Sequence, residues 1–208
     1  MGDARGQGKH AGLTRKQVLA AAVRLADRDG AGALTMRKLA RELDVEAMTL
    51  YHHVRNKAAL EDAIVEYVAT ESFRVPEEPG PWDQLLADYA RALDRALTAH
   101  PGAVTLFATR PALTERNLDE MEKLLGVLRD AGFAPRTALH AAYTLAGAVV
   151  AQHVAAPVKG VQVPHAEETR PLLTEALQEG PATAASRLDF TVNVLVAGLR
   201  ALREQHAD

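Results

Sequence analysis

The sequence predicts an all-α protein, and three observations support this fold class. Alanine and leucine are abundant in a chain of 208 residues that is nearly half apolar, and both residues favour helices. Apolar residues recur three and four positions apart, as they do on one face of a helix, and no stretch alternates convincingly as a strand. Short segments rich in glycine and proline divide this pattern into separate helices.

The N-terminal part begins with an expected flexible arm at residues 1–13, which is polar and glycine-rich and lacks the apolar core of a secretory signal. Thr14 and Gln17 have the spacing of a capping box, in which a hydroxyl and an amide cap the start of a helix reciprocally. The helix that follows is expected to end at Gly30, because glycine readily adopts the backbone conformation of a helix terminus.

Three further helical patterns come next. Thr35 can cap the first, a tight turn at residues 44–45 ends it, and the second covers about Ala47–His53. Asn56 can cap the third, which continues to about Phe73. We expect residues 14–60 to form an N-terminal domain with its helix-turn-helix at about 35–54.

A break with three prolines at residues 75–81 precedes longer helical patterns in a larger domain, residues 61–208. These helices are expected over Trp82–His100, Leu113–Ala131, Arg136–Ala156, Glu168–Glu179 and Thr183–Gln205. The most apolar run, residues 141–151, is shorter than the roughly 18 residues that indicate a membrane span. The chain has no cysteine, which excludes disulfides and thiolate metal sites. We therefore expect a cytoplasmic protein without membrane association.

Charge is distributed unevenly along the chain. Residues 1–60 contain eleven lysine and arginine residues against six aspartate and glutamate residues, whereas residues 61–208 contain thirteen against twenty-one. A basic N-terminal part and an acidic C-terminal part suggest that the first binds an anion and that the second forms a separate domain. Ordinary surface charge produces such an imbalance often enough that it only supports this interpretation.

Residues 35–54 fit a helix-turn-helix. The apolar side chains that can form one small core with the preceding helix are Leu39, Ala40, Val45, Leu50 and Val54. Their burial leaves largely outside Met48, Thr49, Tyr51, His52 and His53. A short helix that exposes such residues beside a basic surface fits a DNA major groove, which is about 12 Å wide. Any short helical hairpin shares this outline, so the particular residues have to show whether this one binds DNA.

Residues 35–57 closely resemble the DNA-binding domain of the tetracycline-repressor (TetR) family. The resemblance covers residues 14–68 strongly, and its most specific matches are Leu50-Tyr51, His53-Val54, Asn56-Lys57 and Leu60. Weaker landmarks look like the branch with a tetracycline-repressor-like C-terminal domain, namely Trp82, Thr109-Arg110-Pro111, Ala131-Gly132-Phe133 and Gly198-Leu199. The resemblance implies a transcriptional regulator that binds double-stranded operator DNA, is controlled by a small-molecule effector and needs no cofactor.

The resemblance also implies a set of DNA-binding residues, which are Thr35, Arg37, Ala47, Met48, Thr49, Tyr51, His52, His53 and Lys57. Arg37 matches a base or phosphate contact, and residues 47–49 match positions that reach bases or backbone. Residues 51–53 match contacts to phosphate and thymine methyls, and Lys57 matches a phosphate clamp. The first two residues of 47–49 replace more polar or rigid ones, so we expect a different operator. Asp44 stands where the family usually has glycine, and aspartate tolerates the left-handed conformation better than most residues.

Other interpretations of these residues stay open. Arg37 and Lys57 could be ordinary surface charges, and Tyr51 could serve mainly packing. A metal-binding pair at His52 and His53 is disfavoured, because adjacent residues on a helix point about 100° apart.

The last helical pattern is apolar on two sides. One stripe has coiled-coil spacing and contains Leu188, Val192, Leu195, Leu199 and Leu202, and the other contains Phe190, Val194, Ala197 and Ala201. Such a helix needs two partners, which we expect to be its own domain and a second copy. We assign the first stripe to a homodimer interface, with Gly147 allowing close packing of the helix over 136–156. A dimer would present two recognition helices about 34 Å apart to a palindromic operator, whereas the alternative is an interior helix of a monomer.

The middle helices are expected to enclose an effector pocket. Its candidate lining residues are Phe73, Trp82, Leu86, Tyr89, Leu93, Leu106, Phe107, Thr109, Met121, Leu124, Leu128, His140, Tyr143 and Thr144. Any one of them could instead belong to the core. One helical stripe contains His140, Tyr143, Thr144 and Gly147, and it could place polar groups in an otherwise apolar cavity.

The resemblance permits a more specific expectation about the effector. The positions at which the family's tetracycline-binding branch uses histidine and asparagine to hold its metal–drug complex align with Phe73, Tyr89 and Leu106, while Thr109 persists. None of the three replacements is a good ligand for a hard metal ion. We therefore expect an apolar effector, bound without metal, and not magnesium-tetracycline.

Two other classes of protein are the alternatives. A DNA-binding scaffold without ligand control would have a solid core, whereas a regulator needs a cavity of at least ~300 Å³. An enzyme is disfavoured, because no nucleophile–base spacing, phosphate-binding loop or metal cluster is evident and the histidines of the body are scattered.

Overall fold

The computed structural model of the chain describes residues 12–110, 114–155, 170–178 and 183–205, and the regular elements in these ranges are all helical. The predicted all-α fold is confirmed. Most of the expected N-terminal arm lies outside the described residues, as do the expected starts of helices at Leu113 and Glu168.

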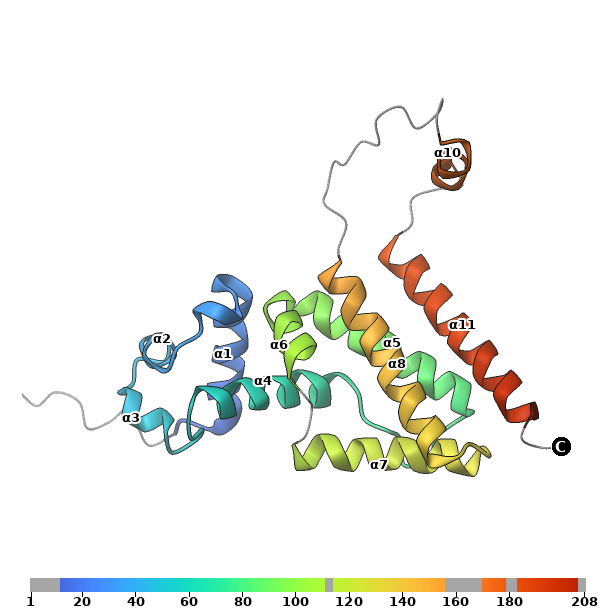
Figure 1. Ribbon diagram of the computed structural model, residues 1–208. Coiled ribbons are helices and arrows are strands. Elements are labelled where there is room, and N and C mark those ends of the chain that lie inside the picture. Colours follow the sequence, from blue (N-terminus) through green and yellow to red (C-terminus); the bar gives the residue numbers. More distant parts are fainter. Residues whose placement is uncertain (1–11, 111–113, 156–169, 179–182, 206–208) are drawn as a thin grey trace, which may run out of the picture.

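A small N-terminal bundle contains α1 (Arg15–Asp29), α2 (Met36–Glu42) and α3 (Ala47–Leu50). The predicted capping box is present, since the Gln17 N–H donates to the Thr14 hydroxyl and the Thr14 N–H donates to the Gln17 side chain. Gly30 ends α1 with a φ of +83° and leads into the short 3₁₀ helix η1 (Ala31–Ala33). We call this bundle, together with the first half of the next helix, the head (Figure 1).

The turn between α2 and α3 depends on Asp44. Its φ of +54° lies in the left-handed region, and it is the one non-glycine residue with positive φ in the described part of the chain. Aspartate tolerates this conformation, so the expected turn survives without glycine. The α3 helix is shorter than predicted, because after Leu50 the backbone continues in tight turns, with the His53 N–H donating to the Leu50 carbonyl over 2.9 Å.

One continuous helix, α4 (Lys57–Ser72), leads from the head into the rest of the molecule (Figure 1). Asn56 caps it as predicted, accepting a 2.8 Å hydrogen bond from the Ala59 N–H. Leu60 and Ile64 on its first half are fully buried in the core of the head. The domain boundary expected between residues 60 and 61 falls inside this helix and stays a prediction.

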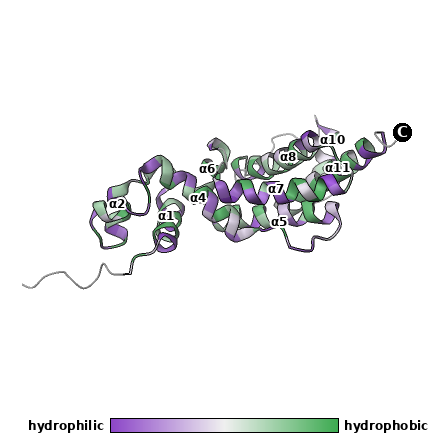
Figure 2. Ribbon diagram, turned by 90° about the horizontal axis from the view of Figure 1, so that it is seen from below, coloured by the Kyte–Doolittle hydropathy of each residue, from purple (hydrophilic) through white to green (hydrophobic). Residues whose placement is uncertain are grey.

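The remaining helices form the body, which consists of α5 (Trp82–Ala99), η2 (Pro101–Ala103), α6 (Val104–Thr109), α7 (Glu115–Asp130), α8 (Pro135–Val154), α10 (Pro171–Gln178) and α11 (Ala184–Gln205). The sequence did not predict α6, whose six residues are too few to show a helical period. Leu86, Leu97, Leu128 and Leu145 are almost fully buried in one core shared by α5, α7, α8 and α11. Hydrophobic and hydrophilic residues alternate along these helices, as expected where one face is buried and the other exposed (Figure 2).

The head and the body meet at a second joint besides α4. Asp27 on α1 lies 2.9 Å from His100 Nδ1, and its other carboxylate oxygen accepts a 2.9 Å hydrogen bond from the Gly102 N–H. Gly102 packs so closely on α1 that an added Cβ would lie 2.2 Å from the carbonyl carbon and oxygen of Ala26. The absence of a side chain at Gly102 therefore permits this contact.

None of the helices in the described ranges is both long and apolar enough to cross a membrane.

Candidate DNA-binding surface and ligand cavity

The residues expected to contact DNA lie on α2 and its N-cap, on α3 and the turns that follow it, and at the start of α4. Met48 is 69% exposed, Tyr51 and His52 are also exposed, and Ala47, Thr49 and His53 are half-buried. Arg37 is exposed on α2 and makes no ion pair with any residue described. Thr35 caps α2, its hydroxyl accepting from the Lys38 N–H at 3.2 Å, so its role here is structural as well. The structure thus brings the expected set to one surface, whose function stays a prediction.

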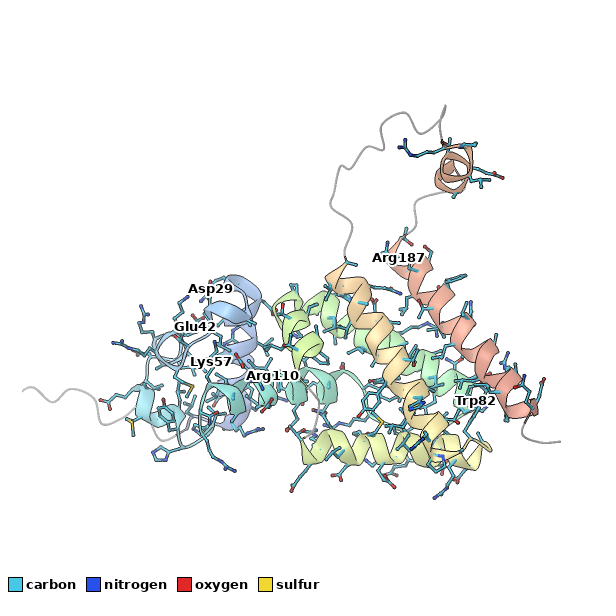
Figure 3. All side chains as sticks on the ribbon, in the orientation of Figure 1. Asp29, Glu42, Lys57, Trp82, Arg110 and Arg187 are labelled. Carbon is cyan, nitrogen blue, oxygen red and sulfur yellow. The ribbon has the colours of Figure 1, made fainter. Side chains whose placement is uncertain are left out.

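Lys57 stands at the first position of α4, beside this surface. Its Nζ lies 3.5 Å from Glu61 Oε1, one helical turn further along. Glu61 also accepts hydrogen bonds from Arg110, and Figure 3 shows Lys57 and Arg110 labelled close to the junction of head and body. Lys57 remains 45% exposed, so its ammonium is available to a phosphate oxygen.

A cavity of about 770 Å³ lies between α4, α5, α6, α7 and α8, and most of its wall is apolar. Half of the candidate pocket residues line it, namely Phe73, Tyr89, Leu93, Phe107, Met121, Leu124 and Tyr143. Gly147, expected at the dimer interface, lines it too. The body therefore has the cavity that a ligand-controlled regulator needs and a solid scaffold lacks.

Seven candidate pocket residues do not line this cavity, and the expectation for them was wrong. Trp82, Leu86 and Leu128 are buried in the core of the body, where the Trp82 ring packs edge-on against Phe133 with centroids 4.9 Å apart. Leu106 is buried instead with the core of the head.

The other three misplaced residues are polar and point to solvent. Thr109 is exposed, and its hydroxyl donates to the Thr105 carbonyl on its own helix. His140 and Thr144 are exposed because the opposite face of α8, with Ala141 and Leu145, fills the core. Of the stripe that the sequence predicted, Tyr143 and Gly147 line the cavity, whereas His140 and Thr144 do not.

The sequence missed the contribution of α4 to the cavity. Val65, Ala69, Thr70 and Ser72 on the second half of this helix all line the wall. Val65 and Ala69 are one turn apart, and neither was needed for the predicted core of the head, which is the signal that could have identified them. The polar lining residues Arg110, Asn117 and Glu120 were missed as well.

Three ionisable groups of the cavity wall are either neutral or paired. Burial, helped by nearby Tyr143, raises the pKa of Tyr89 to about 12, so its phenol stays neutral at physiological pH. Burial alone would raise the pKa of Glu120, but hydrogen bonds from Lys123 and the Val75 N–H together outweigh it and hold this pKa below its ordinary value. Arg110 is paired with carboxylates on α4. The wall therefore favours an occupant without a large net charge.

The positions linked to metal–drug binding do not fit a hard metal ion. Phe73 and Tyr89 form an edge-to-face aromatic pair with centroids 5.3 Å apart on the cavity wall, while Leu106 lies outside it. A hydrocarbon ring and a neutral phenol are poor ligands for magnesium, which prefers carboxylate, carbonyl and water oxygens. In the part of the chain described, no three His, Cys, Asp or Glu side chains come together as metal ligands would.

The apolar stripe of α11 that was expected at the dimer interface is mostly buried within one subunit, so this expectation was wrong. Leu188, Val192 and Leu199 are buried against α5 and α8 of the same subunit, and Leu195 packs there too. They are therefore not available to a second copy, and only Leu202 of that stripe is substantially exposed. The second stripe is the one left outside, with Phe190 71% and Val194 55% exposed. The sequence could not rank the two stripes, because both are apolar.

The outer stripe of α8 lies next to this surface. It contains His140, Tyr143, Gly147, Ala151 and Val154, all exposed and spaced three or four residues apart. We call this stripe, together with the exposed α11 stripe of Phe190, Val194, Ala197 and Ala201, the outer face. Its small residues would allow another helix to approach closely.

The chain combines a helix-turn-helix head, a single connecting helix and a helical body that contains a cavity. This arrangement defines a class of protein, the one-component transcriptional regulator, in which one chain contains both the DNA-binding and the ligand-binding domain. Residues 18–64 match the family described as bacterial regulatory proteins, tetR family, and residues 75–202 match the tetracyclin repressor-like C-terminal domain. The chain belongs to the TetR family, and it is a ligand-responsive, DNA-binding transcriptional regulator and not an enzyme.

Individual relatives agree with this assignment. The chain is 39% identical over 176 residues to the class D tetracycline repressor protein of Escherichia coli, covering 80% of this chain and 79% of that protein. It is similar in structure to apo ActR from Streptomyces coelicolor, with a TM-score of 0.79, 28% identity and 94% and 99% of the two chains covered. It is also similar to a single-substitution variant of TetR from Acinetobacter baumannii, with a TM-score of 0.70, 30% identity and 92% and 99% covered. That variant was crystallised with minocycline, and ActR also with actinorhodin.

Proposed function

We propose that this regulator is a cytoplasmic repressor, that it binds a palindromic operator as a homodimer, and that a small, largely apolar effector releases it. The effector binds in the cavity of the body without a metal ion. The DNA-binding residues are those of the surface formed by α2, α3 and Lys57, with α3 in the major groove.

The observation that carries this proposal is the course of α4. Its first residue, Lys57, stands beside the expected DNA surface, and its last two turns line the cavity through Ala69, Thr70 and Ser72. A helix of 16 residues spans about 24 Å. A ligand that shifts the last turns of a rigid helix also moves its first turn, so occupancy of the cavity and the position of Lys57 are coupled. The ligand acts only through its different affinity for the two arrangements.

The chemistry of the wall supports an apolar effector. The cavity of about 770 Å³ is large enough for a molecule of several fused rings, and Phe73, Tyr89 and Phe107 offer aromatic faces to it. The neutral phenol of Tyr89 can donate a hydrogen bond to an oxygen of the ligand. Crystals of two relatives with minocycline and actinorhodin support a small organic effector, and the replaced metal-binding positions favour one that brings no magnesium.

The outer face supports a homodimer. Phe190 and Val194 are large apolar side chains that one copy leaves in solvent, and Gly147, Ala151 and Ala197 beside them are small. Exposed apolar patches of this kind mark interaction sites. Two α8 helices and two α11 helices would then form a four-helix interface. The cavity opens toward the same face, since Tyr143, Gly147 and Ala151 belong to both.

The DNA-binding proposal is tested with two substitutions of different expected effect. Lys57→Ala removes a phosphate contact, so it should weaken binding to every duplex similarly and lower the dependence of log K on log salt by about one per subunit. Thr49→Ala changes a side chain on α3, so it should change which bases are preferred at one operator position, by roughly 1–3 kcal/mol. Selection of bound sequences from random DNA, followed by salt titrations of the selected duplex, measures both effects.

Arg129→Ala provides the control, because it removes an exposed cation from α7 on the body. It should leave affinity, salt dependence and base preference unchanged. If Lys57→Ala and Thr49→Ala both behave like this control, the docking surface is wrong.

A further inference from the structure

Glu61 lies between two cations that belong to different parts of the molecule. Lys57, beside the DNA surface, is 3.5 Å from one carboxylate oxygen of Glu61. Arg110, on the cavity wall, donates to the other oxygen from Nε at 3.1 Å and from a terminal nitrogen at 2.6 Å. The second terminal nitrogen of Arg110 donates to Asp62 at 2.5 Å. These four side chains form a charged cluster without net charge at the start of α4.

The two cations hold Glu61 with different strength. Arg110 uses a planar fork with three hydrogen bonds, two of them short, and is only 23% exposed. Lys57 makes one long contact from a 45% exposed position, where water competes for its ammonium. Glu61 itself is only 16% exposed, so its charge has to be neutralised by a partner. Arg110 provides most of this neutralisation, and Lys57 is therefore held loosely.

A loosely held Lys57 is in the state that a phosphate contact requires. If the Arg110 guanidinium leaves, Glu61 and Asp62 form a local negative charge next to the expected path of the DNA backbone. Glu61 then has Lys57 as its remaining close cation among the described residues, and a carboxylate at that distance competes with phosphate for the ammonium. Loss of Arg110 thus weakens DNA binding without any change in the side chains that touch DNA.

We propose that Arg110 and Glu61 are positioning residues that set the strength of the Lys57 contact to DNA. When the Arg110 guanidinium withdraws into the cavity, the Glu61 carboxylate loses its main partner and forms its ion pair with Lys57 instead. This inference rests on the proposed phosphate contact of Lys57. It adds an electrostatic route from the cavity to the DNA surface beside the tilt of α4. It also specifies the ligand further, because an apolar effector with an oxygen acceptor facing Arg110 would draw the guanidinium inward.

The test uses the full-length protein and a duplex of random sequence, because a phosphate contact does not depend on base sequence. Arg110→Ala mimics the state in which the guanidinium has moved away from Glu61. It should weaken binding about threefold to tenfold and lower the salt dependence by about one per subunit, as Lys57→Ala does. Glu61→Gln removes the competing charge with nearly the same shape, so the Arg110→Ala/Glu61→Gln double variant should bind within about twofold of wild type.

If Arg110 serves only to hold α6 against α4 through its ion pair, the variants should show the opposite pattern of DNA affinities. Glu61→Gln alone would then break the same ion pair and weaken binding as Arg110→Ala does, and the double variant would show no rescue. That result overturns the inference, provided that thermal unfolding shows all variants folded. Arg110→Ala in a Lys57→Ala background should have no further effect, and an additional full loss there would also overturn it.

The same measurements separate this inference from the proposed function. If Lys57→Ala leaves binding and salt dependence unchanged, the DNA contact itself is wrong and the inference falls with it. If Lys57→Ala weakens binding but Glu61→Gln fails to rescue Arg110→Ala, the proposed DNA contact stands and only the role of Glu61 is wrong.

Discussion

Replacing Val194 with glutamate should convert the protein from a dimer to a monomer and weaken operator binding by roughly 10²–10⁴-fold. Val194 lies in the middle of the exposed apolar stripe of α11 and is 55% exposed in one copy. A carboxylate there costs little in a monomer, because water solvates it. In a dimer it would be buried without a partner, and an unpaired buried charge destabilises an interface by several kcal/mol. Each monomer would then bind only one half-site.

Sedimentation velocity and DNA titration measure the two parts of this expectation. Thr98→Glu is the matched control, since Thr98 is exposed on α5 outside the outer face and the substitution adds the same charge. Val194→Ala should weaken the dimer only modestly, because it removes apolar area without adding charge. Circular dichroism should be unchanged in all three. A Val194→Glu protein that stays dimeric at micromolar concentration would show that the second copy binds elsewhere.

Replacing Gly102 with alanine should lower the unfolding temperature by roughly 5–10 °C. An alanine Cβ would lie 2.2 Å from the carbonyl carbon and oxygen of Ala26, and those are backbone atoms that cannot move aside as a flexible side chain does. Either α1 or η2 has to shift. The shift would also break the hydrogen bond from the Gly102 N–H to Asp27 and disturb the nearby pairing of Asp27 with His100.

Gly126→Ala is the control for this prediction. Gly126 lies inside α7, and an added Cβ there would meet nothing within 4 Å. Because alanine is the better helix former, this variant should be as stable as wild type or slightly more so. Differential scanning calorimetry of the two variants gives the comparison. Equal unfolding temperatures would mean that the head does not pack on η2 as closely as described.

The local signals in the sequence were sufficient for the head. Capping residues Thr14, Thr35 and Asn56 start the helices where the sequence predicted, because a cap depends on neighbours three residues away. Asp44 adopts the left-handed turn for an equally local reason. Two local features were missed, the short η1 helix and the early end of α3, where tight turns replace the last predicted helical residues.

The body was harder to predict because its residues are similar in kind. Alanine and leucine occur on every face of α8 and α11, so apolarity alone did not distinguish a face packed on its own subunit from one left exposed. That is why the outward position of His140 and the burial of Leu188 were unexpected. The cavity also depends on the second half of α4 and on Arg110 at the end of α6. Their proximity follows from the tertiary fold and from no periodicity in the chain.

The central claim is that occupancy of the body cavity controls DNA binding, and one measurement tests it directly. After an operator has been selected from random DNA, its affinity is measured with and without small organic molecules that bind the body. At least one such molecule should weaken operator binding by roughly 5–150-fold. The Ala146→Trp variant replaces a lining residue with one whose indole fills part of the cavity. It should bind the operator but lose this response to ligands. An operator affinity that no cavity ligand changes would contradict the account.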